Sequence, residues 1–301
     1  MLEINTVHNQ FLELNNSTVQ LALKPEYLIH TFISGNKYRK LKYNLEKAKD
    51  LKNDTILSFG GAYSNHIAAT AFAGKFYGFR TVGIIRGEEL VDKVGSNPTL
   101  KFAKGCGMQF KFVDRETYRH KTEVDFVDSL KAEFGDFYLV PEGGTNLLAV
   151  RGCEEILNKN DSDFDVICCS IGTGGTISGV INASKSHQKI LGFPALKGDF
   201  IREDIRKFAT KDNWDLITDY HFGGYGKIKP ELIAFINDFK KRYNIPLDPV
   251  YTGKMMYGIF DLIEKRFFPK DSKILAIHTG GLQGIEGMNI TLKRKEWPLI
   301  K

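Results

Sequence analysis

The sequence has few cysteines, few prolines and no long apolar run, and each shortage excludes a class of protein. Its four cysteines form no CxxC pair and no metal-ligand spacing, which argues against a disulfide scaffold or a structural metal site; they are Cys106, Cys153, Cys168 and Cys169. No apolar run approaches the roughly 20 residues of a membrane-spanning helix. Residues 1–5 lack the basic-then-apolar pattern of a secretory signal. We therefore expect a cytoplasmic protein whose cysteines are small buried hydrophobic residues and hold no metal.

The excess of one charge sign is also small, with 42 Lys and Arg residues against 36 Asp and Glu. Basic residues are scattered, apart from short clusters at 37–42 and 240–242. A nucleic-acid-binding surface is usually more concentrated and interleaved with aromatic residues. We expect no nucleic-acid or membrane partner, whereas the cluster at 37–42 favours a small anionic ligand nearby.

From residue 55 onward, short apolar runs alternate with amphipathic stretches. These runs predict strands over 55–59, 81–85, 109–113, 137–140, 165–169, 189–193 and 273–277, and an earlier run predicts a strand over 19–23. The stretches predict helices over 65–77, 97–104, 123–133, 146–157, 175–184, 202–208, 230–243 and 254–264. Repeated strand–helix units indicate an α/β protein with open, twisted, mostly parallel sheets covered by helices. The two series of units join near residue 150, and two such lobes place a ligand in the cleft between them.

Three glycine-bracketed segments stand out, at 34–37, 60–66 and 172–176. The third, Gly-Thr-Gly-Gly-Thr, lies between an apolar run and a helical pattern, where backbone N–H groups commonly hold a phosphate. It is not a Walker loop, because no Gly-Lys-Ser/Thr follows, and Ile177 stands where a dinucleotide motif needs its third glycine. The segment therefore predicts a compact nest for a monophosphate.

The first segment offers an isolated lysine, Lys37, close to Gly35 and just before a helix expected from about Tyr38. A phosphate nest combined with such a lysine indicates a pyridoxal phosphate enzyme, in which the lysine forms a Schiff base with the cofactor. A reactive lysine must lose its proton, so burial or nearby cations must lower its pKa. Arg39, Lys40 and Lys42 are available for this, but the sequence does not say which of them points toward Lys37.

Four polar residues extend the candidate site. Ser64 and Asn65 open a predicted helix, where they suit an N-cap and can also meet a ligand. Tyr225 and Tyr251 both lie in glycine-containing turns, which suits a turn aromatic or an acid–base group in a dry pocket.

In combination these segments resemble the pyridoxal phosphate enzymes that include D-cysteine desulfhydrase and 1-aminocyclopropane-1-carboxylate (ACC) deaminase. The resemblance runs from about Ser34 to Gly281. Its motifs are Gly-Asn-Lys-x-Arg-Lys-Leu at 35–41, Ser-Asn-His at 64–66, Gly-Thr-Gly-Gly-Thr at 172–176, Gly-Tyr-Gly at 224–226, Asp-Pro-Val-Tyr-Thr-Gly-Lys at 248–254 and His-Thr-Gly-Gly at 278–281.

The resemblance implies a set of cofactor-binding residues. Lys37 would be the Schiff-base residue, and Asn65 would contact the ring hydroxyl of pyridoxal 5′-phosphate. Thr252 or Thr279 would meet the pyridine nitrogen, and the sequence does not decide between them. The phosphate would be held by Gly172, Thr173, Gly174, Gly175 and Thr176.

It also implies the substrate side and the overall organisation. Ser64, Tyr225 and Tyr251 would line the site of a small amino-acid substrate, and either Lys37 or a tyrosine would be the working base. The implied fold is tryptophan synthase β-like, fold type II, and usually homodimeric. We expect residues 1–39 plus 151–301 to form a large cofactor-binding domain and residues 40–150 a small α/β domain.

The chemistry implied is that of a lyase. Thr252 and Thr279 are neutral hydroxyls, which supply no charge to the ring nitrogen, so the ring is a weaker electron sink than one paired with a carboxylate. A weaker sink suits β-elimination of a thiolate, as from D-cysteine, giving a 2-oxo acid and ammonia. ACC deamination is the alternative, and a non-catalytic protein that binds an amino acid or a small anion is a third reading. The family commonly has Gln at Tyr63 and an Arg-Asp-Asp run near 24–27, so the preferred substrate and its stereochemistry stay open.

Overall fold

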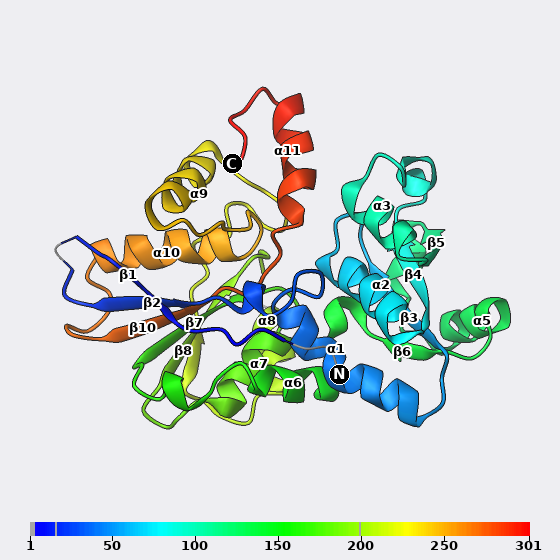
Figure 1. The fold of residues 1–301 in the computed structure, drawn as a ribbon, viewed down its shortest axis with the longest axis horizontal. Helices are drawn as coiled ribbons and strands as arrows, with labels where there is room; N and C mark the ends of the chain where they lie inside the picture. Colours follow the sequence, from blue (N-terminus) through cyan, green and yellow to red (C-terminus); the bar gives the residue numbers. More distant parts are fainter. Residues whose placement is uncertain (1–3, 16, 199) are drawn as a thin grey trace.

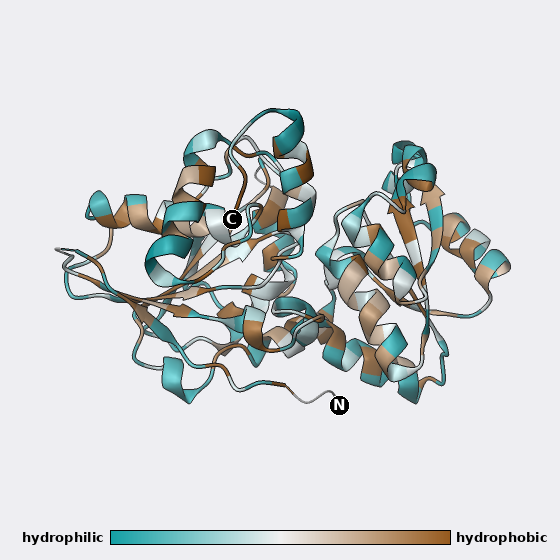
Figure 2. Cartoon of the chain, turned by 45° about the horizontal axis from the view of Figure 1, so that its top comes forward, coloured by the Kyte–Doolittle hydropathy of each residue, from teal (hydrophilic) through white to brown (hydrophobic). Residues whose placement is uncertain are grey.

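The computed structural model describes residues 4–15, 17–198 and 200–301, and it contains two sheets (Figure 1). Residues 1–3, part of the expected signal-free N-terminus and of the expected large domain, lie outside the described residues. No described helix combines the length and apolar character needed to cross a membrane. Figure 2 shows the apolar residues concentrated in both sheets and on the helix faces that cover them.

The larger sheet has six strands. In spatial order they are β1 (Gln10–Leu12), β2 (Gln20–Lys24), β10 (Lys273–Ile277), β7 (Val166–Ile171), β8 (Lys189–Pro194) and β9 (Trp214–Leu216). All neighbours are parallel except β1 and β2, and Ala276 of β10 lies opposite Cys168 of β7. The central strands are buried on both faces, as expected where helices cover a parallel sheet on both sides.

Successive residues of the large sheet pack against different helices, because side chains of a strand alternate between its faces. Cys168 packs in the cluster with α9 (Pro230–Tyr243) and α10 (Thr252–Glu264). Cys169 packs in the cluster with α7 (Gly175–Ala183) and α8 (Phe200–Arg206), which Cys153 of α6 (Leu147–Glu154) joins. These three cysteines are fully buried, and all four are free thiols.

The smaller sheet has four parallel strands, in the order β5 (Gln109–Val113), β4 (Arg80–Arg86), β3 (Thr55–Gly60) and β6 (Tyr138–Val140). Helices α1 (Asn36–Asp50), α2 (Asn65–Tyr77) and α3 (Pro98–Gly105) pack on one face, where Ile56 and Ile85 point. Helices α4 (Arg115–Arg119) and α5 (Val124–Phe134) cover the other face, over Leu57 and Phe59.

The expected fold class is confirmed, and so are the strand–helix units from residue 55 onward. The sequence analysis missed β1, β9, α4 and α11 (Gly284–Arg294), of which the two strands have three residues each. The domain boundaries expected at 39/40 and 150/151 stay predictions; each falls inside a helix, α1 and α6. Those two helices pack on each other, and in Figure 1 α1 begins near α6 and α7 and continues beneath the smaller sheet.

Candidate active site

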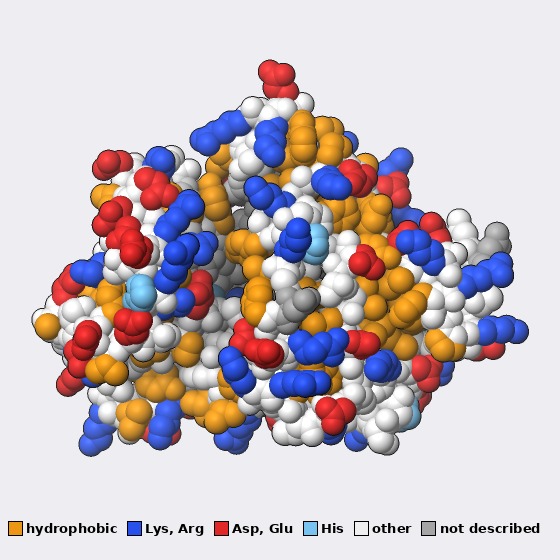
Figure 3. Space-filling view, turned by 180° about the vertical axis from the view of Figure 1, so that it is seen from behind, with side chains coloured by type: hydrophobic (Ala, Val, Ile, Leu, Met, Phe, Trp, Pro, Cys, Tyr) orange, Lys and Arg blue, Asp and Glu red, His pale blue; other side chains and the backbone are white. Residues whose placement is uncertain are grey.

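The expected motifs meet in one cleft at the carboxyl ends of β3, β7 and β10. Its lining includes most of the expected site residues, namely Lys37, Ser64, Asn65, Gly172, Thr173, Gly174, Thr176, Tyr225, Tyr251 and Thr279. The cleft holds about 670 Å³ of space free of protein atoms, counting the part open to solvent. Figure 3 shows a hollow between the two parts of the molecule, with Lys and Arg side chains gathered beside it.

Lys37 and the glycine turn at 172–176 are joined through one asparagine. Lys37 Nζ donates to Asn36 Oδ1 at 2.8 Å, and Asn36 Nδ2 donates to Thr176 Oγ1 at 2.8 Å. Helix α1 begins at Asn36, so Lys37 lies in its first turn instead of just before it. Gly35 precedes that turn with φ +59°, and a Cβ at this position would lie 2.0 Å from the Thr279 carbonyl oxygen. The glycine therefore lets the start of α1 approach the segment after β10.

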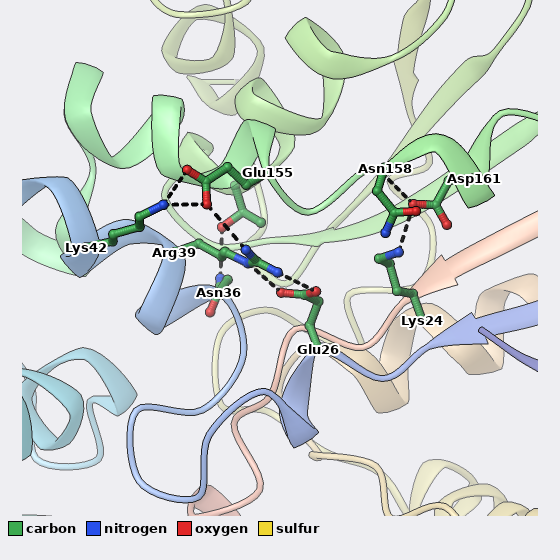
Figure 4. Close-up of polar contacts among 9 residues, drawn as sticks. Lys24, Glu26, Asn36, Arg39, Lys42, Glu155, Asn158 and Asp161 are labelled. Carbon is green, nitrogen blue, oxygen red and sulfur yellow. Dashed lines mark hydrogen bonds and ion pairs between the residues drawn. The ribbon is translucent and has the colours of Figure 1, made fainter. Parts of the chain in front are cut away.

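Ion pairs to two carboxylates, Glu26 and Glu155, hold α1 in place and engage two of the cations near Lys37 (Figure 4). Arg39 pairs with the fully buried Glu26 at 3.0 Å, and Lys42 pairs with Glu155 at 2.7 Å. Both partners lie away from the cleft lining, so neither Arg39 nor Lys42 points toward Lys37. These pairs neutralise two of the three cations next to the lysine.

Lys40 is the cation that enters the cleft, one helical turn after Lys37. Its Nζ donates to the Gly143 carbonyl at 2.9 Å and to Thr145 Oγ1 at 3.0 Å, and it lies 3.4 Å from Thr173 Oγ1. Part of Lys37 is accessible from the cleft, yet desolvation, helped by the charge of Lys40, lowers the pKa of Lys37 to about 7. Lys37 can thus carry a neutral amine near neutral pH. The sequence analysis offered Lys40 as one of three candidate cations and did not choose among them, although the i, i+3 spacing of Lys40 from Lys37 was a usable signal.

The turn at 172–176 connects β7 to the first turn of α7. Its Gly174 has φ +82°, and the N–H groups of Gly175 and Thr176 have no partner within the helix because they open it. Gly175 itself is not part of the lining; a Cβ there would lie 2.8 Å from the Thr145 methyl carbon. The positive end of the α7 dipole, the free N–H groups and Lys40 make this end of the cleft suited to an anion.

Ser64 and Asn65 reach the cleft from the start of α2. Ser64 Oγ accepts a hydrogen bond from the Ile67 backbone N–H at 3.2 Å, so the residue is an N-cap that also lines the cleft. Asn65 Oδ1 is buried and has no hydrogen-bond partner among the described residues. A buried amide oxygen without a partner is costly unless a ligand satisfies it. Tyr63 is not part of the lining, and its ring lies where a side chain at Gly287 of α11 would be.

His66, the third residue of the Ser-Asn-His motif, is buried and lines the cleft. Its Nε2 lies 2.8 Å from Ser58 Oγ, which donates its single hydrogen to the Val140 carbonyl. Nε2 must therefore be the donor to Ser58, which leaves Nδ1 as a bare acceptor, and no described residue partners it. Burial, then the charges of Lys37 and Lys40, lower the pKa of His66 well below its usual value, so the ring is neutral.

Tyr225 and Tyr251 both line the cleft, and their rings lie close together. Their ring centroids are 6.1 Å apart in an edge-to-face arrangement. Desolvation raises the pKa of Tyr225 although 48% of its surface is exposed, and burial raises that of Tyr251 further. Both hydroxyls therefore keep their protons at neutral pH.

The two threonines that the sequence left open occupy different places. Thr279 lines the cleft, and its Oγ1 lies 3.3 Å from Ser170 Oγ. Thr252 opens α10 and is absent from the lining, and its buried Oγ1 has no described partner. The nearby carboxylate, Asp248, accepts hydrogen bonds from the backbone N–H groups of residues 250, 251 and 252 at 2.7–3.0 Å. The lining itself contains no carboxylate among the described residues.

Comparisons with known proteins identify the family of this chain. The family described as pyridoxal-phosphate dependent enzyme matches residues 6–280. A relative named putative 1-aminocyclopropane-1-carboxylate deaminase, from Pyrococcus abyssi, is 31% identical over 89% of this chain and 86% of its own length. The Arabidopsis thaliana bifunctional D-cysteine desulfhydrase/1-aminocyclopropane-1-carboxylate deaminase is 31% identical over 88% of this chain and 73% of its own.

A solved structure of an ACC deaminase homologue superposes with a TM-score of 0.84. It shares 26% identity and covers 98% of this chain and 95% of its own. The predicted cofactor, pyridoxal phosphate, and the enzyme class are confirmed. This chain belongs to the family of pyridoxal-phosphate dependent enzymes.

Proposed function

We propose that this enzyme catalyses β-elimination from a small amino acid that carries a good leaving group, D-cysteine being the best candidate. Cysteine and water would give hydrogen sulfide, pyruvate and ammonia. The observation that carries the proposal is the absence of a carboxylate from the described lining where Thr279 and Ser170 lie. Asp248, the carboxylate near that end, is engaged by three backbone N–H groups.

The cleft fits the cofactor at each end. The turn at 172–176 and Lys40 suit its phosphate, and the unsatisfied Asn65 Oδ1 suits a polar group on its ring. We assign Lys37 as the residue that binds it covalently, and Thr279 in preference to Thr252 as the partner of its ring nitrogen. When bound, pyridoxal phosphate supplies an electron sink for the bond broken at the substrate Cα.

We assign the proton transfer at the substrate Cα to Lys37 and not to the tyrosines. Lys37 Nζ, with a pKa of about 7, accepts the proton from the substrate Cα. The tyrosines are poor bases because their raised pKa values keep them protonated; they donate hydrogen bonds to the substrate instead. Ser64 Oγ, beside them in the lining, contacts the substrate carboxylate.

A second candidate, ACC deamination, is favoured by the names of the relatives. Purified enzyme should be offered D-cysteine, L-cysteine, β-chloro-D-alanine and ACC, with the 2-oxo acid identified in each case. The proposal expects pyruvate from D-cysteine or β-chloro-D-alanine and little 2-oxobutanoate from ACC. Efficient release of 2-oxobutanoate from ACC would contradict β-elimination as the main activity and support ACC deamination.

The ring-nitrogen assignment is tested by Thr279→Val and Thr252→Val. The first should shift the absorbance of the bound cofactor and lower kcat, whereas the second should leave both nearly unchanged. The reverse pattern would assign the contact to Thr252.

We also propose that the protein is a cytoplasmic homodimer. The family resemblance supports the dimer, and the four free thiols suit a reducing compartment. Sedimentation equilibrium of the holoenzyme should give twice the mass of one chain, and a monomer would contradict the proposal.

A further inference from the structure

Lys254 is a buried lysine that the proposed chemistry leaves unused. It is 2% exposed and lies in the first turn of α10, and burial lowers its pKa to about 8. No described carboxylate pairs with it; its Nζ instead donates to the backbone carbonyls of His221 at 2.9 Å and Gly224 at 2.8 Å. Burying an ammonium group is costly, so its two hydrogen bonds to backbone carbonyls suggest a specific structural role for Lys254.

The segment that Lys254 holds is 221–226, which carries Tyr225 to the cleft. Phe222, Gly223, Gly224 and Gly226 all have positive φ, between 53° and 113°. Glycine-rich backbone of this kind has much conformational freedom to lose, so it needs contacts from outside to stay in one shape. A further contact with α10 is made by the Phe222 ring, which packs edge-to-face on Tyr257 at 5.0 Å.

The N-terminal end of α10 also holds Tyr251 in place. Asp248 accepts the backbone N–H of Tyr251 at 2.7 Å, and Tyr251 is the residue at the N-cap of α10. Lys254 therefore ties the loop of Tyr225 to the helix end that carries Tyr251, and the two rings meet at 6.1 Å.

We propose that Lys254 is a positioning residue that sets Tyr225 opposite Tyr251 and so defines the substrate face of the cleft. This inference rests on the proposed function, in which both tyrosines meet the substrate. Lys254 touches neither substrate nor cofactor in this role; it acts through Tyr225.

Lys254→Met tests the inference, since it keeps the apolar stem and removes the donors. Lys211→Met is a matched control, because Lys211 Nζ also holds two backbone carbonyls, those of Asn182 at 2.7 Å and Ser184 at 2.6 Å, outside the cleft lining. The first readout is amide hydrogen exchange of the holoenzyme over residues 219–228, which needs no turnover. Lys254→Met should accelerate exchange there about tenfold or more, and Lys211→Met should not.

The second readout is a double-mutant cycle with Tyr225→Phe. Lys254→Met alone should lower kcat/KM by on the order of 10²-fold, as expected for a misplacement of about 1 Å. In the Tyr225→Phe background it should add little, because the group it positions is already gone. Unchanged exchange, or losses that multiply in the double variant, would overturn the inference. If the wild type produces no 2-oxo acid, the proposed function fails, and the exchange data alone decide whether Lys254 fixes the loop.

Discussion

Replacing Lys37 by methionine should make the cofactor-free protein more stable, because the desolvated lysine is a stability cost. Its pKa falls from 10.5 to about 7 on folding. At pH 7 this difference corresponds to a cost of up to about 4 kcal/mol. Methionine removes that cost, and it also removes the hydrogen bond to Asn36, worth about 1 kcal/mol. We expect a net gain of roughly 1–3 kcal/mol at pH 7.

The same pKa change makes the stability of the wild type depend on pH. Between pH 7 and 10.5 the unfolded lysine binds a proton that the folded one does not, so the wild type gains stability as pH rises. The advantage of Lys37→Met should therefore shrink toward pH 10.5. Urea unfolding of both cofactor-free proteins at several pH values measures this difference in stability. Lys104→Met, a substitution at an exposed lysine, is the control and should change the free energy of unfolding little. A variant less stable than wild type at pH 7, or a difference independent of pH, would refute the reasoning.

Two further predictions concern the surroundings of Lys37. Burial and the charge of Lys40 together lower the pKa of Lys37, and Lys40→Met removes the second of these causes. The rate at which cofactor-free enzyme rebinds pyridoxal phosphate should then have a pH midpoint above about 7. An unchanged midpoint would mean that burial alone lowers the pKa of Lys37. Gly35→Ala puts a Cβ 2.0 Å from the Thr279 carbonyl oxygen, so the backbone must move by about 1 Å. We expect the variant to retain the cofactor poorly and to lose about 10²-fold of its activity. Gly78→Ala, with a similar φ of +79° and open space around it, should cost only about 1 kcal/mol of stability, and equal behaviour of the two variants would contradict the close approach.

Much of the fold was accessible from the sequence because periodicity is a local property. The helices over 65–77 and 230–243 and the strands over 109–113 and 273–277 have the predicted bounds. The convergence of glycine segments was also accessible, since the carboxyl ends of parallel strands share one edge of a sheet. Three-residue strands such as β1 carry too little pattern to be recognised.

The electrostatics of the site could not be read from the sequence. Arg39, Lys40 and Lys42 look equivalent as neighbours of Lys37. Their roles separate only because Glu26, from the segment before the helix, pairs with Arg39 and Glu155, 113 residues along the chain, pairs with Lys42. The choice between Thr252 and Thr279 likewise depends on tertiary placement, since each is a threonine followed by a glycine and only Thr279 lines the cleft. The tautomer of His66 follows from Ser58 and the Val140 carbonyl, and no local sequence pattern connects these residues to it.

Borohydride reduction of the holoenzyme decides whether Lys37 binds the cofactor covalently. The reduced protein, digested and analysed by mass spectrometry, should carry the pyridoxyl phosphate adduct on the peptide containing Lys37, and Lys37→Ala should carry none. An adduct on Lys40 or Lys254, or on no lysine at all, would overturn the assignment of Lys37.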